Sequence, residues 1–282
     1  MQFLEIVLNA LSSRLSGLIL FLFFFQVNAY SQFWEAGGFI GTSNYTGDLA
    51  RKIVPSESNF SAGLLGRYNI SEYFSWRFGI NYAKVSGGDY NFKEYQNRNL
   101  SFFSHIWELD NRIEFNFVRF GTGVLAKRHS AFFFAGINAF YFNPKAKYNG
   151  SIVQLQPLGT EGQNLPGHKK YSRVNVAIPV GLGYKYSLSD NWVLAFEISV
   201  RKTFTDYLDD VSTTYPNFEQ LQSRSGSDAV ALSDRSGELN HSARQATEGN
   251  YRGDPAIKDW YFITGFSLTY RFTPIRCMFS KN

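Results

Sequence analysis

Eight stretches of this chain alternate apolar and polar residues with a period of two, the pattern of a β-strand with one apolar face. The clearest stretch covers residues 107–117. One face carries Trp107, Leu109, Ile113, Phe115 and Phe117. The other face carries Glu108, Asp110, Arg112, Glu114 and Asn116. Five successive polar positions would make a poor water-excluding core, but they suit the interior of a membrane barrel whose outer face meets lipid.

The same pattern predicts the remaining strands. We expect strands at residues 33–41, 60–70, 74–85, 102–118, 131–142, 173–188, 192–204 and 260–272. Residues 131–142 are apolar on both faces, and we expect Gly136 and Asn138 to set the phase by pointing inward. Pro179 lies inside the sixth strand, where its missing N–H predicts a bulge or a local bend. The last strand ends in Phe272, an aromatic ending typical of barrels inserted by the outer-membrane assembly machinery.

Short and long connections alternate along the chain. Tight turns are expected at residues 69–73 and 187–191, an intermediate link at 119–130, and long loops at 42–59, 86–101, 143–172 and 205–258. Such alternation is typical of barrels whose short turns face the periplasm and whose long loops face the exterior. The sequence therefore predicts an all-β fold, a small antiparallel transmembrane barrel of about eight strands, OmpA/OmpW-like, with long extracellular loops. We expect the last loop, which is polar, to be mobile or bound to a partner.

The inward positions of these strands carry both signs of charge. An eight-stranded barrel is just wide enough to be filled by side chains, and buried charges need partners. The sequence thus predicts a plugged barrel with a charge network in its lumen, rather than a diffusion pore. The network residues are Arg67, Arg77, Glu108, Asp110, Arg112, Glu114, Lys185, Glu197 and Arg201. The tryptophans near predicted strand ends are candidates for interfacial aromatic belts, namely Trp34, Trp76, Trp107, Trp192 and Trp260.

The N-terminus carries a candidate secretion signal. Residues 15–25 form an apolar run behind Arg14, and the small residues that follow predict cleavage after Ala29. The alternative is a transmembrane anchor, but the run has ~11 residues, whereas a spanning helix needs ~20. We therefore expect a signal peptide at residues 1–29, an outer-membrane barrel at 30–272 and a periplasmic tail at 273–282.

Composition narrows the classes of partner. Cys277 is the only cysteine, so the chain has neither a disulfide framework nor a Cys-based metal site, and we expect no cofactor. The net charge is +5, but the basic residues are scattered, which argues against nucleic acid as a partner and leaves outer-membrane lipid. Basic residues do recur at the predicted periplasmic turns and tail. We expect a periplasmic partner to present acidic groups to Arg119, Lys127, Arg128 and Arg276.

A lipid-modifying barrel enzyme would need a nucleophile, a base and an orienting acid close together. His105 lies near Ser101 and Ser104, but its phase is outward whereas Glu108 faces inward, so we interpret His105 as an interfacial residue. The other histidines lie in a turn or in loops without metal-ligand spacing, namely His129, His168 and His241.

Three carboxylates open the last long loop. Asp206, Asp209 and Asp210 could bind a cation weakly, but we interpret them as a solvated acidic edge of that loop.

Several ordered segments share a pattern with one family. They are residues 34–41 (WEAGGFIG), 43–49 (SNYTGDL), 134–137 (FAGI), 140–145 (FYFNPK), 177–186 (AIPVGLGYKY), 203–210 (TFTDYLDD) after Arg201, 259–262 (DWYF) and 267–272 (SLTYRF). Together they resemble the PorG-like outer-membrane barrels of the type IX secretion system, over essentially the whole predicted mature chain. The loop at residues 205–258 is a departure, since it is longer than the family leads us to expect.

This resemblance implies a non-enzymatic subunit of a protein-export machine. In that family the barrel ties a periplasmic ring, made of a lipoprotein and a partner protein, to the outer membrane. The family offers no catalytic residue to carry over. From the residues alone, a stand-alone barrel that acts as an adhesin or surface-binding protein stays an alternative, and a lipid-modifying enzyme is a weaker one.

Overall fold

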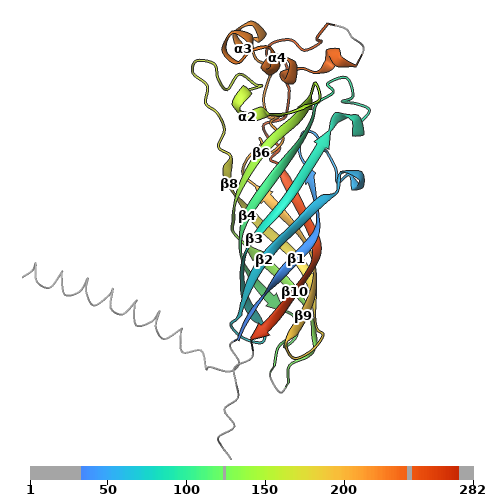
Figure 1. Ribbon diagram of the computed structural model, residues 1–282, viewed down its shortest axis with the longest axis vertical. Helices are drawn as coiled ribbons and strands as arrows, with labels where there is room; N and C mark the ends of the chain where they lie inside the picture. The colour runs from blue at the N-terminus through green and yellow to red at the C-terminus, as the bar shows by residue number, and fades with distance from the viewer. Residues whose placement is uncertain (1–32, 123–124, 240–242, 273–282) are drawn as a thin grey trace, which may run out of the picture.

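A closed antiparallel β-barrel dominates the computed structural model, which describes residues 33–122, 125–239 and 243–272 (Figure 1). The strands are β1 (Phe33–Thr46), β2 (Asn59–Asn69), β3 (Phe74–Gly88), β4 (Ser101–Asn116), β5 (His129–Gly136), β6 (Asn138–Tyr148), β7 (Ser151–Gln154), β8 (Val174–Ser187), β9 (Trp192–Thr203) and β10 (Trp260–Phe272). The ring closes because β1 pairs with β10 and β3 pairs with β4. The predicted all-β barrel is confirmed.

Two of the strands, β5 and β6, occupy one position of the ring. Both pair with β4 and with β8 in the same register, and the strand is interrupted between them only at Ile137. With β7 set outside the ring as a hairpin extension of β6, eight strand positions remain. Gly136 lies against the β4 backbone, and Asn138 is buried in the lumen, as expected.

The predicted bulge at Pro179 is absent from β8, which keeps a single register with β9 through this residue. Pro179 instead affects the pairing of β8 with β5 and β6, on the side of β8 away from β9. Extending the register of β5 and β8 places Pro179 opposite Gly136, where the pairing is interrupted. Because proline has no N–H to donate, the ladder loses a rung there without inserting a residue.

The first strand extends past its predicted end to Thr46. Its polar residues from Thr42 to Thr46 pair with β10, although they lack the apolar outer face that marks the rest of the barrel. Tryptophans lie at the short-turn end of the wall. Trp34 and Trp192 contact the aromatic rings of Tyr68 and Tyr270 near the short turns. A further tryptophan, Trp107, lies well inside β4, so its expected place at a strand end is wrong.

The connection between β9 and β10 is folded in its described part, contrary to the mobile loop expected from its composition. It contains α3 (Phe218–Ser225), α4 (Ser227–Ser233) and the 3-10 turn η3 (Ser236–Glu238). We call this connection, with α2 (Leu155–Leu158), the cap. The cap lies over the long-loop end of the barrel (Figure 1). Buried apolar side chains hold it there, among them Leu208, Val211 and Leu232, which pack in one cluster with buried residues of the wall.

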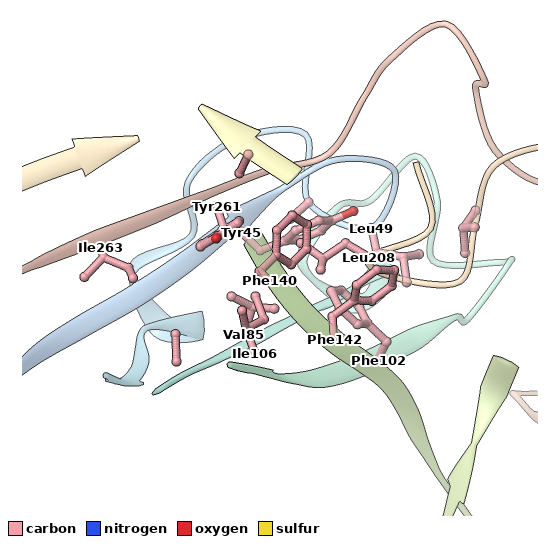
Figure 2. Close-up of a cluster of buried hydrophobic side chains, with 14 of the residues drawn as sticks. Tyr45, Leu49, Val85, Phe102, Ile106, Phe140, Phe142, Leu208, Tyr261 and Ile263 are labelled. Atoms are coloured by element: carbon pink, nitrogen blue, oxygen red, sulfur yellow. The ribbon is translucent and has the colours of Figure 1, made fainter. Parts of the chain in front are cut away.

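The barrel is filled along its length. Phe33 and Phe120 are buried at the short-turn end, and charged side chains fill the middle. At the long-loop end an apolar cluster brings residues of the wall against Leu208 of the cap, as Figure 2 shows. Its larger members include Tyr45, Phe102, Ile106, Phe140, Phe142 and Tyr261.

None of the described helices is long and apolar enough to cross a membrane. The predicted signal peptide and the predicted periplasmic tail lie outside the described residues, as do Arg276, Cys277 and His241.

Candidate functional site

The structure places all nine predicted lumen charges inside the barrel, where each is buried. Glu114 is at the centre of the network. Its carboxylate lies 2.8 Å from Nε of Arg67 and 2.6 Å from Nζ of Lys185. These residues come from β2, β4 and β8, so each ion pair joins strands that are not neighbours in the ring. This is the arrangement that charged inward positions on separate strands require once water is excluded.

Two further ion-pair groups extend the network toward the cap. The Glu197 carboxylate accepts from Arg77 at 2.7 Å and from Arg112 at 2.5 Å. Glu108 lies 3.2 Å from Nε of Arg201 and also accepts the hydroxyl hydrogen of Tyr261. The ninth residue, Asp110, is 3.4 Å from Nε of Arg77 and accepts from Asn138.

The network contains two charges that the sequence reasoning missed. Glu35 lies 2.5 Å from Arg67 and 3.2 Å from Arg271, and it joins β1 and β10 to the rest. The signal was present, because Glu35 stands between the outward Trp34 and Ala36, and Arg271 between two outward aromatics. With these two, the lumen holds six basic and five acidic side chains, almost balanced in charge.

Aromatic rings complete the packing around the charges. The guanidinium of Arg112 lies 3.8 Å from the ring centroid of Phe134, and Nζ of Lys185 lies 4.4 Å from that of Phe132. Arg271 lies over Phe33 at the short-turn end. Such cation–π contacts stabilise desolvated cations. They explain why β5 is apolar on both faces, since its inward phenylalanines pack against the lumen bases.

A second polar site lies where the cap meets the barrel mouth. The Tyr45 hydroxyl is 2.6 Å from the Asp209 carboxylate and 2.9 Å from that of Asp259. Backbone N–H groups of Leu49 and Val211 also donate to Asp209. The site therefore joins β1, the start of the cap and the residue before β10.

The carboxylates that open the last loop are buried, so their interpretation as a solvated acidic edge is wrong. Asp206, Asp209 and Asp210 are at most 3% exposed. Asp210 has partners from a distant part of the chain, and Asp206 has a partner in the same loop. The hydroxyls of Thr160 and Tyr171 donate to Asp210, and that of Ser212 donates to Asp206.

Burial in this site disfavours the charged forms of the carboxyls. It raises the pKa of Asp206 to about 7 and that of Asp210 to about 6. Burial, together with repulsion from neighbouring carboxylates, raises the pKa values of Asp209 and Asp259 well above their ordinary range. Within the described residues, no group of three or more His, Cys, Asp or Glu side chains could hold a metal ion. The raised pKa values mean that these carboxyls keep their protons at higher pH than ordinary Asp side chains do.

The residues considered for lipid chemistry do not come together. His105 faces outward and its Nδ1 lies 2.7 Å from the hydroxyl of Tyr82. Ser104 is buried on the inward face and accepts from the backbone of Asn143. Glu108 is bound by Arg201 and Tyr261 inside the lumen.

The predicted periplasmic contacts that the structure describes lie at the short-turn end of the barrel. Arg119, Lys127 and Arg128 are exposed in the connection between β4 and β5. Arg119 makes one weak ion pair, 3.7 Å from Glu72. This leaves the basic groups of the connection open to solvent.

Several solved structures of outer-membrane barrels are similar to this chain. For each of the three named here, the similar region covers 86% of this chain and 100% of the solved chain. The N-terminal β-barrel domain of OprF from Pseudomonas aeruginosa is 9% identical with a TM-score of 0.36. Ail, the attachment invasion locus protein of Yersinia pestis, is 10% identical with a TM-score of 0.40. The Escherichia coli outer membrane protein W is 11% identical with a TM-score of 0.38.

No curated protein matches the chain. A family model described as a domain of unknown function, DUF6089, matches residues 14–227. Since this match covers more than half of the 282 residues, the protein belongs to the DUF6089 family.

Proposed function

We propose that this protein is a non-enzymatic outer-membrane subunit of a type IX protein-secretion machine, and that it anchors the periplasmic ring to the outer membrane. The filled lumen carries this proposal. From Phe33 and Phe120, through the charge network, to the apolar cluster beneath the cap, buried side chains occupy the interior. A barrel filled in this way acts through its surfaces rather than by conducting solutes.

The segments that resemble PorG-like barrels support the same proposal. Residues 43–49, 203–210 and 259–262 are far apart in the sequence, yet they meet at the Tyr45 hydroxyl. Asp209 accepts from both Tyr45 and the backbone of Leu49. The matching segments therefore build one structural unit, as expected if the resemblance extends over the whole barrel.

The expected partners are the ring lipoprotein and its partner protein. The short-turn end would face them in the periplasm, and it presents Arg119, Lys127 and Arg128. Complementary acidic groups on the ring would orient the encounter and contribute to its specificity.

A pull-down tests the proposal. A tag inserted after Gly249, in an exposed part of the cap, leaves the short-turn end free. Outer membranes are extracted in mild detergent, and co-purifying proteins are identified by mass spectrometry. We expect stoichiometric recovery of a periplasmic lipoprotein and its partner. A barrel that purifies alone, under conditions where the ring survives, would contradict the proposal.

Charge reversal separates the proposed surface from general effects. Lys127→Glu with Arg128→Glu should reduce the recovery of the ring. The matched control is Lys169→Glu with Lys170→Glu, which makes the same charge change on exposed residues of the connection between α2 and β8. Equal recovery from both double variants would remove the short-turn end from the proposal.

A surface-binding barrel is the second candidate, and the cap favours it. Beside α3 and α4 the cap forms an open cleft of about 370 Å³, lined by Tyr148, Gln222 and Arg244 among others. A deletion strain distinguishes the two functions. Loss of many secreted proteins indicates the secretion machine, whereas loss of a single binding trait indicates a surface receptor.

A further inference from the structure

Charges are divided between the two faces of the barrel wall. Every carboxylate on a described strand points into the lumen, namely Glu35, Glu108, Asp110, Glu114 and Glu197. Lys, Arg and His side chains on the outer face are few, and no acidic side chain accompanies them on the described strands. The outward bases are Lys84, His105, His129, Lys145, Lys147 and Lys202.

Most of these bases gather on one side of the barrel, at the long-loop end. Lys84 on β3 pairs in register with His105 on β4, and Phe103 on β4 pairs with Lys145 on β6. Lys147 follows on the same face of β6, and Arg173 immediately precedes β8. We call these five residues, on or next to neighbouring strands, the basic collar: Lys84, His105, Lys145, Lys147 and Arg173. In contrast, β1, β2 and β10 carry no outward Lys, Arg or His.

The basic collar lies where the apolar wall ends. Trp107 and Leu109, the next outward residues of β4 below His105, are 54% and 59% exposed. Lys84 and Arg173 extend over outward rings, with their charged groups 5.2 Å from the centroid of Phe103 and 5.5 Å from that of Tyr141. Long basic side chains beside aromatic rings are typical of the membrane–water interface. The collar is therefore at headgroup depth.

The collar lacks acidic partners among the described residues, since none of its members forms a salt bridge there. Glu57, in the first loop, acts electrostatically on Lys84. Its carboxylate is already bound by Ser86, Tyr90 and Asn91. The positive charge of the collar is thus available to an outside anion.

We infer that the basic collar binds the phosphate groups of a phosphorylated glycolipid in the membrane leaflet on the long-loop side. Lysine ammonium groups and an arginine guanidinium are the usual partners of phosphate, and the adjacent apolar wall would receive the acyl chains. Because the collar covers one side of the barrel, it would hold such a lipid at a fixed position. This inference requires membrane insertion, but not a role in secretion.

Lipid retention tests the inference. The mature protein is folded into phosphatidylcholine nanodiscs that contain either lipid A or its dephosphorylated form, and native mass spectrometry measures bound glycolipid. The native protein should retain lipid A and not the dephosphorylated lipid. The variant with Lys84→Gln, Lys145→Gln, Lys147→Gln and Arg173→Gln should retain at least about tenfold less lipid A, because each basic group near a lipid surface contributes to binding.

A second variant controls for total charge. Lys52→Gln, Lys127→Gln, Arg128→Gln and Lys258→Gln remove the same charge from exposed loop and turn residues, and lipid A retention should stay within about twofold of the native value. The shift of the folded band on unheated gels confirms that each variant has folded. Equal retention of the two lipids by the native protein, or native-like retention by the collar variant, would overturn the inference.

Discussion

Asp209 and Asp259 share the hydroxyl group of Tyr45, at 2.6 and 2.9 Å. A phenol has one hydrogen to donate, so both contacts are full two-centre hydrogen bonds only when one carboxyl is protonated and donates to the phenol oxygen. The pair therefore keeps a proton in a buried site between the barrel mouth and the cap. Losing that proton would place two like charges beside each other in a desolvated space.

The cap should loosen as the pH rises. The folded-state pKa values of Asp206, about 7, and Asp210, about 6, lie above the ordinary value of 3.8. Over the interval between the ordinary and the raised pKa, the folded state binds more protons than the unfolded state. The contribution of these two carboxyls to the stability of the cap is therefore greatest at low pH, and it falls as the pH rises toward their raised pKa values. Hydrogen exchange at about pH 5.5 and pH 8, corrected for intrinsic rates, should show weaker protection of residues 204–239 at the higher pH.

The variant Asp206→Asn should flatten this pH dependence because it removes the group with the higher of the two values. Hydrogen exchange of the barrel strand β4, measured in the same sample, provides an internal comparison. A cap equally protected at both pH values would contradict the assignment of buried protons to this site.

The central carboxylate of the lumen should dominate barrel stability. Glu114→Gln leaves Arg67 and Lys185 buried without their shared anion. Removing one partner of a buried ion pair costs about 3–5 kcal/mol, and we expect a loss of free energy of unfolding in that range. Urea unfolding in lipid vesicles measures it.

The matched control for this substitution is Glu72→Gln. This variant makes the same chemical change at the short-turn end. There the carboxylate of Glu72 lies 3.7 Å from the exposed side chain of its partner Arg119. An exposed pair contributes about 0–1 kcal/mol, so this variant should unfold nearly as the native protein does. Similar losses in both variants would show that the crossing ion pairs do not stabilise the barrel.

Shortening Leu208 should detach the cap from the barrel mouth without unfolding the barrel. Leu208 is fully buried in the apolar cluster at the barrel mouth, whereas Leu239 is 50% exposed. Leu208→Ala removes buried apolar contacts worth about 2–5 kcal/mol. We expect this loss to destabilise the cap rather than the barrel, because the cap is the smaller of the two. We expect faster proteolysis within residues 204–259 and an unchanged shift of the folded band on unheated gels.

Here Leu239→Ala serves as the comparison, because it shortens the same side chain in solvent. Its proteolysis should match that of the native protein. If native, Leu208→Ala and Leu239→Ala proteins were all cleaved at the same high rate, the loop would be mobile rather than folded.

The barrel should not conduct ions. Buried side chains fill the lumen from Phe33 to the apolar cluster, and the charges are paired across it. In planar bilayers the folded protein should give no steady unitary conductance, whereas a porin examined in the same bilayer would. A reproducible conductance from the native protein would contradict the filled lumen and with it the observation that carries the proposed function.

The sequence predicts the barrel well because strand phase is a local property. Alternation around Glu108 and Glu114 places both in the lumen, as the structure does. The cap was not predictable in this way. Asp209 is buried by Tyr45, which lies 164 residues away in the chain, and no local pattern reports that contact. A polar loop that folds through such distant contacts has the same composition as one that does not.

The lumen ion pairs also set an order for folding. Arg77 on β3 meets Glu197 on β9, and Glu108 on β4 meets Arg201 on β9. Neither pair can form while the chain is an open sheet, because each joins strands that are brought face to face by closure. An open sheet in the bilayer would expose these charges unpaired to hydrocarbon. Insertion and closure are therefore coupled, and a half-closed barrel is not a resting state.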